Sequence, residues 1–151
     1  MNILKNLFDH EYKELKRFKG LADKIEALKD DYAKLSDDEL KWHHYAASVF
    51  AFPSITKNEA FGVALAEAMY CYTPAVTFTI PGSGVNWVSI NNETGLEVPN
   101  KDVKAYAQAI DTLLSNDNLC KQFAEAGHKR VKENFTIPQM IKLAEKYYIN
   151  L

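Results

Sequence analysis

The sequence has few of the features that mark specialised classes of protein. It holds only two cysteines in 151 residues, Cys71 and Cys120, and they form no C-x-x-C pair and no disulfide framework. A net charge of −2 gives no reason to expect a nucleic-acid partner. Its apolar stretches are too short to span a bilayer, and no signal peptide is evident. The sequence therefore predicts reduced thiols and a cytoplasmic setting.

Two common phosphate- and metal-binding motifs are also missing from the sequence. No G-x-x-x-x-G-K-[ST] occurs, which excludes a P-loop, and no Asp-x-Asp occurs. We predict no metal site at the adjacent His43 and His44.

What the sequence does contain is typical of a globular protein, at 47% hydrophobic and 25% charged residues. The charge is distributed unevenly, because residues 1–41 hold nine basic and ten acidic residues and the other 110 residues hold the same numbers. This contrast predicts two parts, residues 1–41 and residues 42–151.

The first part has the pattern of an amphipathic helix. Apolar residues recur at three- and four-residue steps, at Leu15, Phe18, Ala22, Ile25, Leu28, Tyr32 and Leu35. Gly20 weakens such a helix without ending it. Ser36, followed three residues later by Glu39, predicts a capping box and a second short helix from Asp37 to about Ala47.

The second part alternates strand and helix patterns. The expected strands are 49–52, 75–79 and 96–98, and the expected helices are 62–71, 85–90, 102–114, 118–134 and a last helix after Thr136. This rhythm predicts an α/β fold, a parallel sheet with crossover helices. The apolar face expected for helix 102–114 comprises Val103, Tyr106, Ile110, Leu113 and Leu114. On the next helix, Arg130 is expected to face water.

The stretch FPSITKNEAFGVALAEAM, residues 52–69, organises the second part. A buried strand stops at Pro53, a polar loop follows, and Gly62 precedes a segment of strong helix formers. Such a helix N-terminus at the carboxyl end of a strand is where open α/β sheets bind anionic ligands. Glu59 and Glu67 bracket it, and ionised carboxylates suit vicinal hydroxyls, although either residue alone is consistent with a solvated surface glutamate.

This stretch resembles the E-x7-E motif of the retaining family 4 glycosyltransferases. The resemblance continues through TPAV (73–76), PGSGV (81–85) and ETGLEV (93–98) and covers roughly residues 42–150. It implies a partial Rossmann-like sheet, the C-terminal lobe of a GT-B enzyme. The chain departs from the family at Tyr72, where many relatives have glycine.

The resemblance also implies roles for individual residues, with no divalent metal and no cofactor beyond the nucleotide-sugar donor. Glu67 would accept from the ribose hydroxyls. Residues 82–84 would form a diphosphate loop, although their composition is equally consistent with a simple turn. The donor sugar would meet Glu59 and the backbone around it, at Ala60, Phe61, Gly62 and Val63. The three residues of the diphosphate loop are Gly82, Ser83 and Gly84.

Residues 1–41 are similar to the extreme N-terminus of SecA, the ATPase of bacterial preprotein export. The similarity ends near Lys41, before any ATP-binding motif of that family, and it indicates a chimera joined at about residue 41. It implies contact with a protein or with the inner face of the membrane. Exchange of this helix between two chains would produce a homodimer.

The function predicted from these features is that of a fragment. The acceptor lobe is missing, and so is the first half of the donor lobe, which supplies an Arg and a Lys to the leaving diphosphate in the family. We therefore predict binding of a nucleotide sugar, whose parent enzyme transfers it to a polysaccharide or lipid-linked acceptor, with no catalytic residue in this chain and no activity in isolation. The alternative is a non-catalytic interaction module that docks through its N-terminal helix.

Overall fold

The computed structural model describes residues 2–149 of the chain. The chain forms two units, of which the first ends at Leu40 and the second begins at Lys41.

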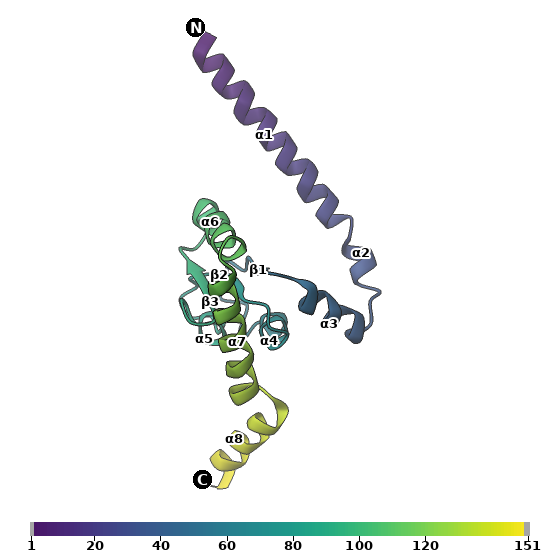
Figure 1. Cartoon of the computed structure of the whole chain (residues 1–151), viewed down its shortest axis with the longest axis vertical. Coiled ribbons are helices and arrows are strands. Elements are labelled where there is room, and N and C mark those ends of the chain that lie inside the picture. The colour runs from purple at the N-terminus through teal and green to yellow at the C-terminus, as the bar shows by residue number, and fades with distance from the viewer. Residues whose placement is uncertain (1, 150–151) are drawn as a thin grey trace. The chain divides into compact units, whose positions relative to one another are not determined.

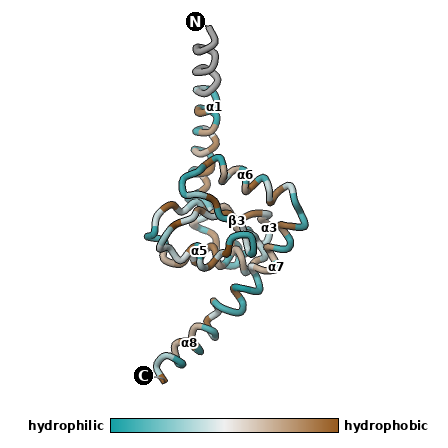
Figure 2. The backbone as a smooth tube through the Cα atoms, turned by 90° about the vertical axis from the view of Figure 1, so that its left-hand side faces the viewer, coloured by the Kyte–Doolittle hydropathy of each residue, from teal (hydrophilic) through white to brown (hydrophobic). Residues whose placement is uncertain are grey.

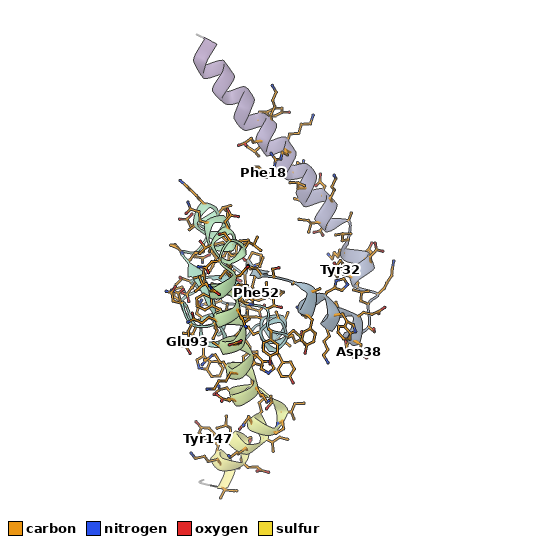
Figure 3. All side chains as sticks on the ribbon, in the orientation of Figure 1. Phe18, Tyr32, Asp38, Phe52, Glu93 and Tyr147 are labelled. Atoms are coloured by element: carbon orange, nitrogen blue, oxygen red, sulfur yellow. The ribbon has the colours of Figure 1, made fainter. Side chains whose placement is uncertain are left out.

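The first unit is helical, as predicted, but its helix is interrupted. Helix α1 spans Asn2–Glu26 and runs through Gly20, and α2 spans Lys29–Tyr32. The interruption falls at the turn between them, where the Leu28 N–H donates to the Ile25 carbonyl three residues back, at 3.1 Å. Asp30 and Asp31 lie in the first turn of α2, where acidic side chains favour a new helix start. Leu15, Phe18 (labelled in Figure 3) and Ile25 are all more than half exposed.

The capping box predicted at Ser36 is confirmed. Helix α3 spans Asp37–Ala46. The Glu39 carboxylate accepts from the Ser36 N–H at 2.8 Å and from the Ser36 hydroxyl at 2.7 Å. The Glu39 N–H points back to the Ser36 Oγ at 3.4 Å. The two side chains thus fix the start of α3 by reciprocal bonds.

The second unit is an α/β fold with a three-stranded parallel sheet, which confirms the predicted fold class (Figure 1). The strands are β1 (Phe50–Phe52), β2 (Ala75–Phe78) and β3 (Gly95–Val98), in the order β1-β2-β3. Phe50 pairs with Ala75, and Ala75 pairs with Gly95. Helices α4 (Val63–Tyr70) and α5 (Val85–Val88) lie in the crossovers, and α6 (Val103–Leu114), α7 (Asp117–Asn134) and α8 (Ile137–Ile149) follow.

Helices cover both faces of the sheet. Successive side chains of β2 point to opposite faces and therefore pack against different helices. Ala75 packs with α4, α5 and Val131 of α7, whereas Val76 packs with α6 and with Phe123 of α7. The sheet therefore lies between two small cores, and α7 contributes to both.

Two residues of the apolar face predicted for α6 are not buried. Val103 is 76% exposed and Leu114 is 55% exposed, whereas Ala109 is buried. Val103 is the first residue of α6, and Leu114 follows the buried Leu113, about 100° further round the helix, so its side chain points to another side. The other predicted residues, Tyr106, Ile110 and Leu113, do pack into the core.

Tyr106 is expected to make the second unit less stable at alkaline pH. Its hydroxyl donates to the Val76 carbonyl at 2.9 Å, and burial raises the pKa of its phenol from 10.0 to about 12. Because the folded pKa lies above the unfolded one, this stabilisation is complete below about pH 10 and is lost as the pH rises to about 12. We expect urea midpoints to fall over that interval, and to fall less steeply in Tyr106→Phe. An equally steep fall in Tyr106→Phe would assign the effect to other groups.

Candidate functional site

The loop between β1 and α4 is built around Gly62 and Glu59. Gly62 directly precedes α4 with a positive φ of 83°, a conformation that glycine adopts without strain. The half-buried Glu59 accepts from the Gly62 N–H through its Oε1, at 3.0 Å. The first glutamate of the motif therefore orders the start of α4 and keeps its Oε2 for another donor.

The loop of residues 81–84 packs directly on this segment. The Ser83 hydroxyl donates to the Glu59 carbonyl at 2.6 Å. A Cβ on Gly84 would lie 2.0 Å from the Ala60 carbonyl oxygen and 3.3 Å from the Phe61 Cα. Only glycine permits this backbone approach, so the structure brings the two predicted stretches together, residues 59–62 and residues 82–84.

Asn86 holds the same loop from its other side, and sequence reasoning missed it. Its Oδ1 accepts from the Ile80 N–H at 2.8 Å, and its Nδ2 donates to the Phe78 carbonyl at 2.9 Å. These two bonds fix the chain as it leaves β2. The available signal was a lone Asn just after a Gly-rich loop, which does not by itself identify a backbone partner.

Glu67 lies on the exposed face of α4. Val63, one turn earlier, is on the same side and is 64% exposed, whereas Leu65, Ala68 and Met69 face the core. Its carboxylate is therefore accessible for hydrogen bonding from solution. Gly62, one of the backbone donors expected to meet the sugar, has its N–H occupied by Glu59.

An aromatic cluster of Phe61, Trp87 and Phe135 lies beside the loop that precedes α4. Phe61 contacts Phe135 edge-on, with ring centroids 5.3 Å apart, and Trp87 lies 4.9 Å from Phe135. The Phe61 side chain therefore packs into this cluster.

Arg130, predicted to face water, donates from Nε to the Val88 carbonyl at 2.9 Å and from a terminal nitrogen to the Trp87 carbonyl at 2.5 Å. That prediction was wrong because α5, too short to satisfy its own carbonyls, needs a donor from α7.

Arg130 is consequently expected to matter for stability. Replacing it with alanine removes two charge-assisted bonds to backbone carbonyls and should lower the free energy of unfolding by about 2 kcal/mol in urea titration. The neighbouring Lys129→Ala removes only an exposed ion pair with Glu133 and should change it by less than about 0.5 kcal/mol. Equal losses in the two variants would show that Arg130 is a surface residue in solution.

The thiols and histidines show no further chemistry in the described part of the chain. Cys71 is buried and Cys120 half-buried, both are free, and burial raises the pKa of each thiol. Among residues 12–149, whose side chains the structure describes, we find no cluster of three or more His, Cys, Asp or Glu able to hold a metal ion. None of the described helices is both long and apolar enough to cross a membrane.

The family of the chain follows from comparison with known proteins. Residues 9–130 match the family described as glycosyl transferases group 1. The chain belongs to this family. The match covers the strand–loop–helix stretch with Glu59, Gly62 and Glu67 and the loop of residues 82–84, and the geometry above is therefore that of a group 1 glycosyltransferase domain.

Individual members show how much of such an enzyme the chain represents. It is 30% identical to the O-antigen chain mannosyltransferase C of Escherichia coli over 100 residues. This match covers 66% of this chain and 26% of that protein. It is 31% identical over 137 residues to a D-inositol 3-phosphate glycosyltransferase of Corynebacterium diphtheriae, 91% of this chain and 30% of that protein. Among solved structures, sucrose-phosphate synthase of Thermosynechococcus elongatus superposes with a TM-score of 0.67 at 27% identity, over 85% of this chain and 35% of that one. The chain thus spans about a third or less of each of these glycosyltransferases.

The family match begins at residue 9, inside the segment that resembles SecA, and ends at residue 130. The expected extent of the resemblance, residues 42–150, differs from this range at both ends. The SecA-like origin of residues 1–41 and the chimera are not tested by these matches and stay predictions.

Proposed function

We propose that this glycosyltransferase group 1 chain binds the nucleotide-sugar donor of a retaining glycosyltransferase at the carboxyl edge of its sheet. The observation that carries the proposal is the contact between residues 82–84 and residues 59–62, where backbone meets backbone in front of α4. This contact supports a site made of a glycine loop, a helix N-terminus and the carboxylate of Glu59, groups that suit a sugar diphosphate.

The residues divide the proposed ligand between them. Glu59 Oε2 accepts from hydroxyls of the donor sugar, because Oε1 already binds Gly62. Glu67, exposed on α4, accepts from the ribose hydroxyls. Backbone amides at Ala60, Phe61 and Val63 and those of Gly82 and Gly84 meet the phosphates, whereas the Ser83 N–H already donates to the Ile80 carbonyl at 3.0 Å. The positive end of α4 favours the phosphate charge.

We also propose that the chain alone does not transfer the sugar. It corresponds to about a third or less of the proteins it matches, and it supplies neither an acceptor lobe nor the Arg–Lys pair that the family resemblance assigns to the leaving diphosphate. Stabilising that charge is usually the largest catalytic term. The parent activity is transfer to a polysaccharide or lipid-linked acceptor.

Saturation-transfer NMR with UDP- and GDP-sugars tests the binding proposal. We expect base and ribose protons of one of them to receive saturation, with a Kd in the millimolar range, about −4 kcal/mol. A transfer assay on the same sample should show no glycoside. Saturation of neither nucleotide sugar would refute donor binding, and turnover above a Glu59→Ala/Glu67→Ala control would refute inactivity.

A second candidate function concerns residues 1–41 as a docking segment for a protein or membrane surface, consistent with a SecA-like origin. The observation that favours it is the exposed apolar side of α1, with Leu15 and Ile25 each 69% exposed. Sedimentation of the full chain alone and with anionic vesicles distinguishes dimerisation by helix exchange from membrane binding. A monomer that stays in the supernatant would argue against both.

A further inference from the structure

One side of α1 is apolar and is not covered within the first unit. Leu15, Phe18, Ala22 and Ile25 follow one another at steps of three, four and three residues, and Leu21 lies at their margin. We call the first four residues the α1 seam. Leu15 and Ile25 are each 69% exposed and Phe18 is 57% exposed (Phe18 is labelled in Figure 3). A helix in water owes most of its stability to the packing of such a side, so the α1 seam needs a partner.

The charges that flank the α1 seam change sign along the chain. Residues 13–19 hold four basic residues and one acidic residue, a net charge of +3, whereas residues 23–31 hold two basic and four acidic residues, a net charge of −2. The order does not stabilise α1 alone, because its first turn holds no acidic residue and it ends at Glu26, against the preference of the helix macrodipole. The Arg17 guanidinium lies 5.8 Å from the centre of the Phe18 ring, so positive charge lies directly beside the α1 seam.

This charge order fits a second copy of α1 that runs in the opposite direction. An antiparallel pair places the basic stretch 13–19 of each chain beside the acidic stretch 23–31 of the other, whereas a parallel pair places like charges side by side. A membrane fits less well. Residues 1–41 hold nine basic and ten acidic residues, so they present no excess of positive charge to anionic headgroups.

The sizes of the residues in the α1 seam favour the same orientation. In an antiparallel pair centred near residue 20, Phe18 faces Ala22 of the second copy, so each large ring meets a small side chain. Leu15 faces Ile25 of the second copy in the same register. A parallel pair would set Phe18 against Phe18 and Ala22 against Ala22, which crowds one layer and leaves a gap in the next.

We infer that the α1 seam pairs with the α1 seam of a second copy, antiparallel, and that this contact joins two chains in a dimer. The pairing rests on the docking role proposed for residues 1–41 and names the partner for it. Lys19 approaches its own copy near the two-fold axis, and Asp23, one turn further along each helix, offsets the repulsion. The α1 seam includes no residue of the second unit. This dimer therefore differs from one made by helix exchange, in which α1 would pack on the second unit of the other chain.

Oxidative cross-linking of the full chain tests the orientation. Leu15→Cys and Ile25→Cys are oxidised separately and as a mixture. We expect disulfide-linked dimers in the mixture and about tenfold fewer in either variant alone, because each of these positions faces the other one across the pair. The wild type is the background control, since its own Cys71 is buried and Cys120 is half-buried.

Sedimentation equilibrium of the full chain measures the affinity of the pair. Phe18→Ala should raise the Kd of the dimer about tenfold or more, and alanine favours a helix more than phenylalanine does, so weaker helix propensity would not explain the loss. Lys16→Glu/Arg17→Glu, which reverses two charges of the basic stretch, should weaken the pair by a similar factor at low ionic strength. Tyr147→Ala removes a 77% exposed tyrosine from α8 and is the control, with a Kd within about twofold of the wild type.

Several results would overturn the pairing. They are a chain that remains monomeric at every concentration, a dimer that Phe18→Ala leaves unchanged, and cross-links that form within each single variant, which would indicate a parallel pair. A dimer that gives no cross-link even in the mixture would indicate helix exchange instead. A monomer that sediments with phosphatidylglycerol vesicles would keep the docking role of residues 1–41 and exclude the second copy as its partner, whereas a monomer that does not would remove both.

Discussion

Gly84→Ala is expected to destabilise the second unit by about 3 kcal/mol and to abolish nucleotide-sugar binding. The added Cβ would lie 2.0 Å from the Ala60 carbonyl oxygen, a backbone atom that cannot rotate away. The clash either overpacks the contact or is relieved by moving the loop away from residues 59–61, which opens the site. Urea unfolding gives the stability, and UDP-sugar saturation gives the binding.

Gly82→Ala is the control for this effect, since it lies two residues away in the same loop. It has a positive φ of 81° but no atom within 4 Å of an added Cβ. The substitution should therefore cost only about 1 kcal/mol of backbone strain. If Gly84→Ala were no more harmful than Gly82→Ala, the close contact between the two loops would not exist in solution.

Glu67→Ala should remove detectable nucleotide binding without changing stability. Its carboxylate is exposed and would contribute only to the ligand, and a hydrogen bond to a charged group is worth about 1.5–3 kcal/mol, tenfold or more in Kd. Starting from millimolar affinity, such a loss leaves no measurable saturation. The thermal midpoint should stay within about 2 °C of the wild type.

Glu59→Ala should lose both nucleotide binding and stability. It removes the acceptor of the Gly62 N–H, which should cost about 1 kcal/mol in addition to the binding loss. Glu125→Ala, an exposed glutamate on α7, is the control and should change neither. A Glu67→Ala variant that binds UDP-sugars like the wild type would remove Glu67 from the site.

Local signals in the sequence predicted the parts of the structure that depend on near neighbours. The capping box at Ser36 and Glu39, three residues apart, is present as expected. The three strands and the α4 start at Gly62 also follow from short patterns of apolar runs, Pro and Gly. The capping box and the α4 start are decided by contacts within a few residues, whereas the strands are recognised from local patterns although they pair with residues 20 to 25 positions away.

What the sequence did not reveal depends on contacts between distant residues. Arg130 reaches carbonyls 42 and 43 residues away, and Ser83 bonds a carbonyl 24 residues away. Periodicity could not show that Val103 is 76% exposed, because burial at the end of a helix depends on what distant parts of the chain pack there. The recurrence of Met140, Ile141 and Tyr147 along α8 follows from the sequence, whereas their exposure is known only from the structure; brown segments mark this helix in Figure 2.

The most direct test of the proposed site is where a nucleotide sugar changes the amide spectrum of the full chain. Titration with the UDP- or GDP-sugar that shows saturation should move the amides of residues 59–67 and 81–85 together, with one Kd, because the two loops form one site. The amides of residues 12–40 should stay in place, and Glu67→Ala should abolish the shifts. Shifts confined to residues 12–40, or shifts that survive in Glu67→Ala, would contradict a donor site at the carboxyl edge of the sheet.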